Sequence, residues 1–268
     1  MKSSHHNAPI GIFDSGIGGL SVMQAIKKAL PYEQLIYFGD TARVPYGGKS
    51  SQTIIRYSVE NTNFLLSHQI KLLVVACNTS NAYAMPALHA LTSSLPIVGV
   101  IESGIEKAIN VTRHQRIGII GTKATIQSGI YQSQLKAELP QGFIATIACP
   151  LFVPLVEEGF ADHPATRLII HDYLKPLKNQ QIDTLILGCT HYPFLTRLIQ
   201  EEMGSDVKLV DSASTCAEKI KQLLEEQQLG AEARETECRY YVSDDPERFS
   251  LHAESLLGHP LDTSAQCI

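Results

Sequence analysis

The segment LLVVACNTS (residues 72–80) joins an apolar run to a polar turn. Its first five residues are all hydrophobic and too few for a typical helix, so they predict a strand that is buried on both faces of a sheet. Cys77 follows this run, and the polar residues after it begin a segment that we expect to be helical as far as Leu91. A buried strand that passes through a short polar turn into a helix is the unit from which parallel α/β sheets are built.

The same alternation continues on both sides of this segment. Further short apolar runs predict strands, and these lie at residues 10–13, 35–38, 97–100, 117–120, 144–148, 185–187 and 207–210. Longer segments predict helices, among them residues 20–30, 51–67 and 80–91. Strands of about five residues that alternate with helices of about 10–15 residues indicate βαβ units, so the predicted fold class is α/β with parallel sheets.

Composition limits the classes of function. The chain has 268 residues, which is enough for one large or two medium domains. Its net charge of −5 argues against a nucleic-acid partner or an anionic membrane surface. No apolar run reaches the ~18 residues of a membrane span, and the sequence does not begin with a secretory signal. We therefore expect a cytoplasmic protein with reduced thiols.

Two of the six cysteines stand in matching contexts. Residues 74–79 (VVACNT) resemble residues 186–191 (ILGCTH), about one domain length further along the chain. Cys77 and Cys189 should therefore both lie at the carboxyl end of a strand, the edge where open α/β sheets bind ligands. A helix N-terminus after each would make the thiolate more accessible. A buried cysteine is usually inert, but two in the same setting favour function.

The other cysteines lack this context, and we expect them to be structural or incidental: Cys149, Cys216, Cys238 and Cys267. None of the six forms a CxxC pair, so the sequence predicts no metal site of that kind. His191 lies close to Cys189, which also raises the alternative of a thiol hydrolase. That alternative leaves Cys77 without a role.

Two glycine-rich turns follow the first two predicted strands. DSGIGGL (residues 14–20) lacks the GxGxxG spacing of dinucleotide-binding turns, so we exclude nucleotide binding there. Asp14 or Ser15 could cap the following helix, or both could contact a substrate ammonium group. In GDTARVPYG (residues 39–47), Arg43 is a candidate for an anion contact, with a surface salt bridge as the alternative.

Five motifs together resemble bacterial glutamate racemases: DSGIGGL (14–20), GDTARVPYG (39–47), ACNTSNA (76–82), CPLFVPLVEEG (149–159) and LGCTHYP (187–193). The resemblance implies that Cys77 takes the α-proton from D-glutamate and that Cys189 takes it from L-glutamate. It also implies that Asp14 assists Cys77, that His191 assists Cys189, and that Glu157 orients His191. The substrate-binding residues that it implies are Asp14, Ser15, Tyr46, Gly47, Asn78, Thr79, Thr190 and His191, with Thr122 as a further contact.

The resemblance also implies an architecture and a role. Two similar α/β domains with parallel central sheets would face each other across an active-site cleft. The first would comprise residues 1–96 plus 211–268, and the second residues 97–210. The reaction would need no cofactor, glutamate would be the substrate, and the D-glutamate produced would serve peptidoglycan synthesis. A homodimer is a candidate assembly. The alternatives are an aspartate or broad amino-acid racemase and a non-catalytic amino-acid-binding module.

Overall fold

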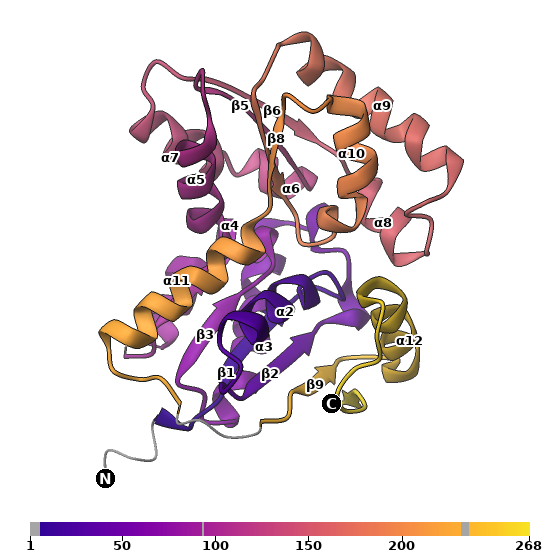
Figure 1. Ribbon diagram of the computed structural model, residues 1–268. Helices are drawn as coiled ribbons and strands as arrows, with labels where there is room; N and C mark the ends of the chain where they lie inside the picture. Colours follow the sequence, from indigo (N-terminus) through magenta and orange to yellow (C-terminus); the bar gives the residue numbers. More distant parts are fainter. Residues whose placement is uncertain (1–5, 93, 232–235) are drawn as a thin grey trace.

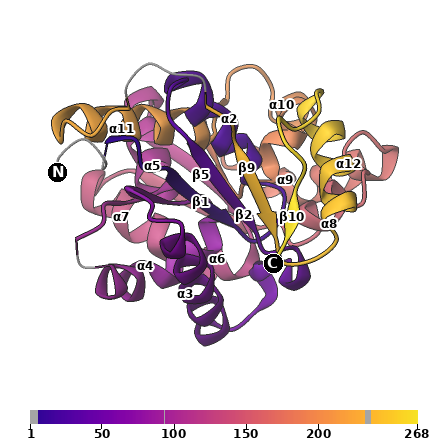
Figure 2. The same ribbon diagram turned by 90° about the horizontal axis from the view of Figure 1, so that it is seen from below.

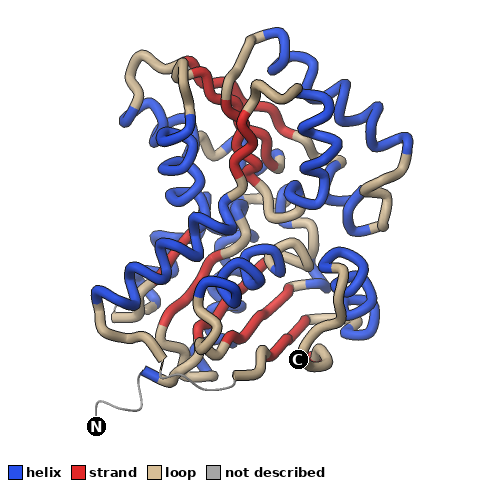
Figure 3. Tube along the Cα trace, viewed as in Figure 1, coloured by secondary structure: helices blue, strands red, loops and turns tan. Residues whose placement is uncertain are grey.

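A computed structural model describes residues 6–92, 94–231 and 236–268 of the chain, and Figure 1 shows two groups of strands, each flanked by helices. All ten strands of the described residues belong to two sheets with parallel pairing throughout. Figure 3 shows loops between the two groups of strands. The predicted α/β class is confirmed.

The first sheet has six strands in the order β10-β9-β2-β1-β3-β4. These strands are β1 (Ile10–Asp14), β2 (Leu35–Gly39), β3 (Leu72–Val75), β4 (Ile97–Gly99), β9 (Arg239–Val242) and β10 (Gln266–Cys267). The second sheet has four strands in the order β6-β5-β7-β8. Its strands are β5 (Arg116–Gly121), β6 (Phe143–Ala148), β7 (Thr184–Gly188) and β8 (Lys208–Val210).

Helices cover both faces of the first sheet, which explains why its central strands are continuously apolar. One apolar cluster joins Ile12 and Val74 to α2 (Leu20–Ala29), α11 (Ser212–Glu226) and α12 (Pro246–Leu257). Another joins Phe13 and Val75, on the opposite face, to α3 (Ser51–Ser67) and α4 (Asn78–Leu91). Figure 2 shows α3 and α11 on opposite sides of these strands.

The second sheet is covered in the same way. The helices α5 (Val100–Val111) and α7 (Ile130–Glu138) pack on the face that carries Ile119. The helices α8 (Phe152–Glu157), α9 (Pro164–Asn179) and α10 (Thr196–Met203) pack on the face that carries Leu187. The remaining short elements are α6 (Lys123–Gln127) and the 3₁₀ helices η1 (Thr41–Arg43), η2 (Tyr46–Gly48) and η3 (Tyr192–Leu195).

The chain passes from the first sheet to the second after β4 and returns after β8. Strand pairing places residues 97–99 in the first sheet, because β4 pairs with β3 along Leu73–Val75. Our predicted boundary had assigned these three residues to the second domain. The two-domain division itself stays a proposal. Within the described part of the chain, no helix has the length and apolar character needed to cross a membrane.

Candidate active site

Two thiols lie at the carboxyl ends of strands, one in each sheet. Cys77 follows β3 and precedes α4, whereas Cys189 directly follows β7, so both lie at strand ends as predicted. They are 4% and 6% exposed, and neither takes part in a disulfide. The strand ends are also joined directly, because the Thr190 hydroxyl donates a hydrogen bond of 3.1 Å to the Asp14 carboxylate. The structure thus brings together four of the predicted site residues from distant parts of the sequence.

Cys77 has a hydroxyl and a carboxyl group as its polar neighbours. Its thiol donates to the Ser15 hydroxyl over 3.6 Å. Burial and then the nearby charge of Asp14 raise the pKa of the Cys77 thiol to about 12, and hydrogen bonds with the Ser80 backbone and the Ser15 side chain only partly oppose this. Our expectation that the helix N-terminus makes this thiolate more accessible is therefore wrong, because burial outweighs the amides of α4.

Asp14 is fully buried at the end of β1. Its carboxylate accepts a hydrogen bond from the Gly16 amide at 3.1 Å as well as that from Thr190. Burial raises the pKa of Asp14 above its ordinary value, although the charge of His191 and these hydrogen bonds act in the opposite direction. Neither Asp14 nor Ser15 caps the next helix, because α2 begins after Gly19 and has no side-chain cap.

Cys189 has a histidine and, behind it, a carboxylate. His191 Nδ1 lies 3.9 Å from Cys189 Sγ, and His191 Nε2 lies 2.6 Å from Glu157 Oε1. Burial disfavours the imidazolium, but the hydrogen bonds and charges of Cys189 and Glu157 outweigh it and raise the pKa of His191 well above its ordinary value. Burial likewise disfavours the Glu157 carboxylate, but the His191 hydrogen bond and charge lower the pKa of Glu157. The three side chains form a thiol–imidazole–carboxylate relay.

The glycines of DSGIGGL allow the first-sheet loop to approach this relay closely. A Cβ atom on Gly18 would lie 2.6 Å from His191 Nδ1, and one on Gly16 would lie 2.9 Å from Glu157 Oε1. Side chains at either position would displace the relay. The turn that looked like a nucleotide-binding loop instead provides space for two catalytic candidates of the second sheet.

Hydroxyl and amide groups that follow Cys77 in the sequence are hydrogen-bonded to side chains of the second-sheet side. The Asn78 amide donates to the Tyr131 hydroxyl at 2.8 Å, and Tyr131 belongs to α7. Thr79 and Thr122 share a hydrogen bond of 2.9 Å between their hydroxyls, and Thr125 joins them. Sequence reasoning missed Tyr131 and Thr125, because nothing in their local sequence links them to residues more than 40 positions away.

The Tyr46–Gly47 turn reaches the same region. A Cβ atom on Gly47 would lie 2.4 Å from the Thr122 Cβ atom, so this turn packs directly against the second-sheet side. The Tyr46 hydroxyl does not point at the thiols but donates to Asp40 and accepts from Asn61. Arg43 is likewise engaged by side chains rather than open to an anion, because its nitrogens donate to Asp40, Glu60 and Asn61.

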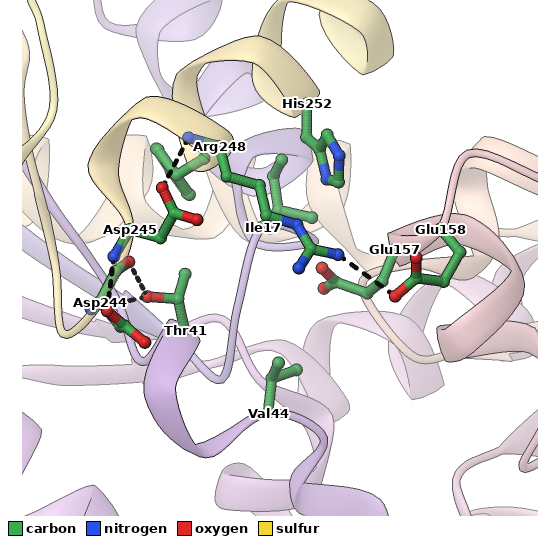
Figure 4. Close-up of a pocket in the computed structure, with 10 residues that line it drawn as sticks. Ile17, Thr41, Val44, Glu157, Glu158, Asp244, Asp245, Arg248 and His252 are labelled. Atoms are coloured by element: carbon green, nitrogen blue, oxygen red, sulfur yellow. Dashed lines mark hydrogen bonds and ion pairs between the residues drawn. The ribbon is translucent and has the colours of Figure 1, made fainter.

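A cavity of about 240 Å³ adjoins the relay on the side of Glu157 (Figure 4). Its lining combines four carboxylates with two basic side chains: Glu157, Glu158, Asp244, Asp245, Arg248 and His252. Figure 4 shows Arg248 of α12 reaching Glu158 at the end of α8, and the two side chains are 3.2 Å apart. Neither thiol lines this cavity.

The donor set is that of acid/base chemistry. No group of three or more His, Cys, Asp or Glu side chains within residues 6–92, 94–231 and 236–268 is placed to hold a metal ion. Each buried thiol has a polar side chain within hydrogen-bond reach, Ser15 at Cys77 and His191 at Cys189. Two such thiols can remove a proton from one face of a bound carbon and deliver a proton to the other.

Comparisons with known proteins agree on one family. Residues 10–220 match the family described as Asp/Glu/Hydantoin racemase. A glutamate racemase of Geobacter metallireducens is 51% identical over 253 residues, which cover 94% of this chain and 93% of the relative. The crystal structure of a glutamate racemase isoform from Bacillus anthracis has a TM-score of 0.94 at 37% identity and covers 98% of both chains. That of Francisella tularensis in complex with D-glutamate has a TM-score of 0.92 at 35% identity, again over 98% of both chains.

Proposed function

The chain belongs to the Asp/Glu/Hydantoin racemase family, and from that premise we propose that it interconverts L- and D-glutamate. It is a glutamate racemase, an isomerase acting on amino acids, and its D-glutamate product serves peptidoglycan and cell-wall synthesis. The observation that supports the mechanism is the pair of buried thiols at strand ends of the two sheets, one beside Ser15 and Asp14 and the other beside His191.

The proton balance of the reaction requires both thiols. Cys189 as thiolate takes the α-proton of L-glutamate, and Cys77 as thiol gives its proton to the opposite face of the carbanion. The products are D-glutamate, a Cys77 thiolate and a Cys189 thiol. The raised pKa of Cys77 keeps it protonated at neutral pH, which is the state needed to start from L-glutamate. A protonated His191 beside Cys189 stabilises the thiolate that this direction requires.

In the reverse direction a Cys77 thiolate takes the α-proton of D-glutamate, and a Cys189 thiol gives its proton to the opposite face. To reach this state from a Cys77 thiol and a Cys189 thiolate, Cys77 must lose a proton and Cys189 must gain one, which we assign to His191. Asp14 lies close enough to raise the pKa of the Cys77 thiol, and its own pKa is raised by burial, so it is suited to accept the Cys77 proton. Meanwhile Glu157 holds His191 by a charged hydrogen bond and fixes which ring nitrogen faces Cys189. These are the roles that we propose for Asp14, His191 and Glu157.

Polar groups around the thiols supply the substrate contacts. We assign the ammonium and the two carboxylates of glutamate to side chains and main-chain groups of both sheets: Asp14, Ser15, Tyr46, Gly47, Asn78, Thr79, Thr190 and His191. Fixed hydrogen-bond donors in a buried site stabilise the charge that develops on the substrate when the α-proton leaves. This stabilisation replaces the electron sink that a cofactor would supply, so we propose that the enzyme uses none.

The other functions that we considered have less support. The Geobacter metallireducens relative, which is 51% identical over 94% of this chain, is named a glutamate racemase, and this disfavours aspartate as the main substrate. A binding module does not need two thiols with separate proton relays, and a thiol hydrolase needs only one. For the partners and the compartment, we propose a cytoplasmic enzyme that forms a homodimer and binds no nucleic acid.

Incubation of L-glutamate with purified protein tests the proposed function. The protein is first dialysed against EDTA and freed of pyridoxal phosphate, and the circular dichroism of the substrate is followed to zero. We expect full racemisation at an unchanged rate after this treatment. Loss of activity that returns with metal or cofactor would contradict the mechanism, and absence of activity under all conditions would contradict the function.

A further inference from the structure

We propose that Asp40, Arg43 and Asn61 are positioning residues that hold the Tyr46–Gly47 turn in place for substrate binding. This inference rests on the proposed function, since it concerns a turn that we expect to contact glutamate. It gives a role to Arg43, which the sequence left without one. The argument depends on a closed set of hydrogen bonds outside the thiol relays.

Asp40 is the centre of this set. It follows β2, and its side chain is completely buried. Arg43 Nε donates to both carboxylate oxygens, at 2.9 and 2.7 Å, and the Ser243 hydroxyl donates at 2.8 Å. The Tyr46 hydroxyl donates to the same carboxylate. A buried carboxylate is stable only when such partners replace water, so removal of one donor affects the position of the others.

Arg43 and Asn61 complete a ring that returns to Tyr46. Arg43 donates to the Asn61 side-chain oxygen at 3.1 Å, and the Asn61 amide donates to the Tyr46 hydroxyl at 3.0 Å. The guanidinium also lies 4.1 Å from the centre of the Tyr57 ring and pairs with Glu60. Only the planar fork of arginine can make these contacts at once, because a lysine has one nitrogen.

The ring differs from a surface salt bridge. Glu60 is about half exposed, and a pair with it alone would contribute little. Asp40, Tyr46 and Asn61 are each no more than 1% exposed, however, so their polar atoms have no access to water. Burial and Asp40 also keep the Tyr46 phenol neutral by raising its pKa, so it remains a hydrogen-bond donor.

The position of Tyr46 is transmitted to the site through Gly47. The Gly47 backbone is packed so closely against Thr122 that a Cβ atom would overlap it, and Thr122 is hydrogen-bonded to Thr79. Asp40 and Asn61 occupy the Tyr46 hydroxyl, so we assign the substrate contact of this turn to its main chain. Loss of this ring of hydrogen bonds should therefore weaken substrate binding while leaving both thiols and their relays in place.

The Arg43→Gln variant tests this inference. We expect the KM for glutamate to rise about tenfold, which corresponds to ~1.4 kcal/mol of binding, with kcat within about twofold of wild type. Arg43→Lys should remain impaired, because it keeps the charge but not the fork. The matched control is Arg56→Gln. Arg56 also lies beside the Tyr57 ring, at 5.1 Å, and pairs with Glu60, but it contacts neither Asp40 nor Asn61.

The Tyr46→Phe variant provides the second test and decides the matter if Arg43→Gln does not fold. It keeps the aromatic ring and removes only the hydroxyl that the two partners hold. We expect a similar rise in KM. In the double variant, Arg43→Gln/Tyr46→Phe, the fold-change in KM should be smaller than the product of the two single-variant fold-changes. An unchanged KM in either folded variant, a loss confined to kcat, or an equal effect of Arg56→Gln would overturn the inference. None of these results would remove wild-type racemase activity, which is what the proposed function itself requires.

Discussion

Cys77 and Cys189 end equivalent strands of the two sheets, but the side chains around them differ in kind. Cys77 faces the Ser15 hydroxyl and a buried Asp14, and its pKa is raised. Cys189 faces an imidazole that a carboxylate holds in its charged form. The repeated strand end thus fixes where each thiol lies, and the loops that follow determine which side chains surround it.

This difference cannot appear in kcat/KM for the two enantiomers. L- and D-glutamate have equal free energies, so thermodynamics requires the same kcat/KM in both directions for every variant. Each thiol and the side chains beside it form one half-site. The two half-sites must be compared through reactions that use only one of them. Elimination of HCl from a β-chloro analogue is such a reaction, because one base removes the α-proton and chloride leaves with the electron pair.

Exchange of either thiol for a hydroxyl should have the largest effect. In Cys77→Ser and Cys189→Ser we expect racemisation to fall by roughly 10²–10⁴-fold, because a hydroxyl is a far weaker base at neutral pH. Cys189→Ser should still eliminate HCl from the β-chloro D-analogue, and Cys77→Ser from the L-analogue. The measurement is the rate at which each enantiomer of the analogue releases the corresponding 2-oxo acid. The same preference in both variants, or full activity in one, would contradict two opposed bases.

Loss of the carboxylate behind His191 should affect one half-site more than the other. In Glu157→Gln the imidazolium loses its charged partner, so we expect elimination from the L-analogue to fall by about 10–100-fold. Elimination from the D-analogue, which uses Cys77, should change by less than about threefold. Ser15→Ala is the matched variant on the opposite side and should reverse this order. Equal losses with both analogues in Glu157→Gln would mean that the half-sites do not act separately.

The Glu157–His191 pair also predicts a pH range in which it stabilises the fold most. The lowered pKa of Glu157 stabilises the fold above its ordinary value of 4.5, and this contribution is lost as the pH falls through the folded pKa. The raised pKa of His191 stabilises the fold below its ordinary value of 6.5, and this contribution is lost as the pH rises through the folded pKa. Both contributions are therefore complete between these two values.

We expect urea denaturation to show this pH range as a difference between wild type and Glu157→Gln. The free energy of unfolding should differ by about 1–3 kcal/mol near pH 5.5, the typical contribution of a charged hydrogen bond. The difference should be smaller near pH 3.5 and near pH 9. Glu158→Gln, next in sequence and exposed, is the control and should show little change at any pH. A difference independent of pH would mean that the ion pair does not exist in solution.

The sequence predicted the positions of the thiols because that inference is local. An apolar run followed by Cys77 or Cys189 specifies a strand end, and the ends of parallel strands lie at one edge of a sheet. The strand β9 was not predicted, because RYYV is short and partly polar, and its pairing with β2 joins residues about 200 positions apart. The two-residue β10 carries no pattern at all.

Burial explains the larger failures at the site. The local rule that helix ends favour thiolates gave the wrong direction for the pKa of Cys77, because only the fold reveals that this thiol is enclosed beside Asp14. For Arg43 the sequence left an anion contact and a surface salt bridge open as alternatives. Its partner Asn61 lies in the middle of α3, where the sequence shows an ordinary polar residue. Both cases concern what surrounds a residue, which local sequence does not contain.

The smallest effect should come from the contact that joins the two half-sites beside the cavity of Figure 4. Arg248 and Glu158 are 3.2 Å apart, and their side chains are 54% and 64% exposed. An exposed pair of this kind contributes about 0.2–1 kcal/mol and is weakened by salt. We therefore expect Arg248→Gln to change racemisation by less than about twofold. Elimination from the L-analogue should also stay within about twofold, because hydrogen bonds with His191 and the Ile17 backbone already hold Glu157. If Arg248→Gln instead reduced L-elimination as strongly as Glu157→Gln, the position of Glu157 would depend on α12. The Cys189 relay would then depend on α12 as well as on the loop after β1, and the contrast between two separately equipped thiols would have to be replaced by one shared network.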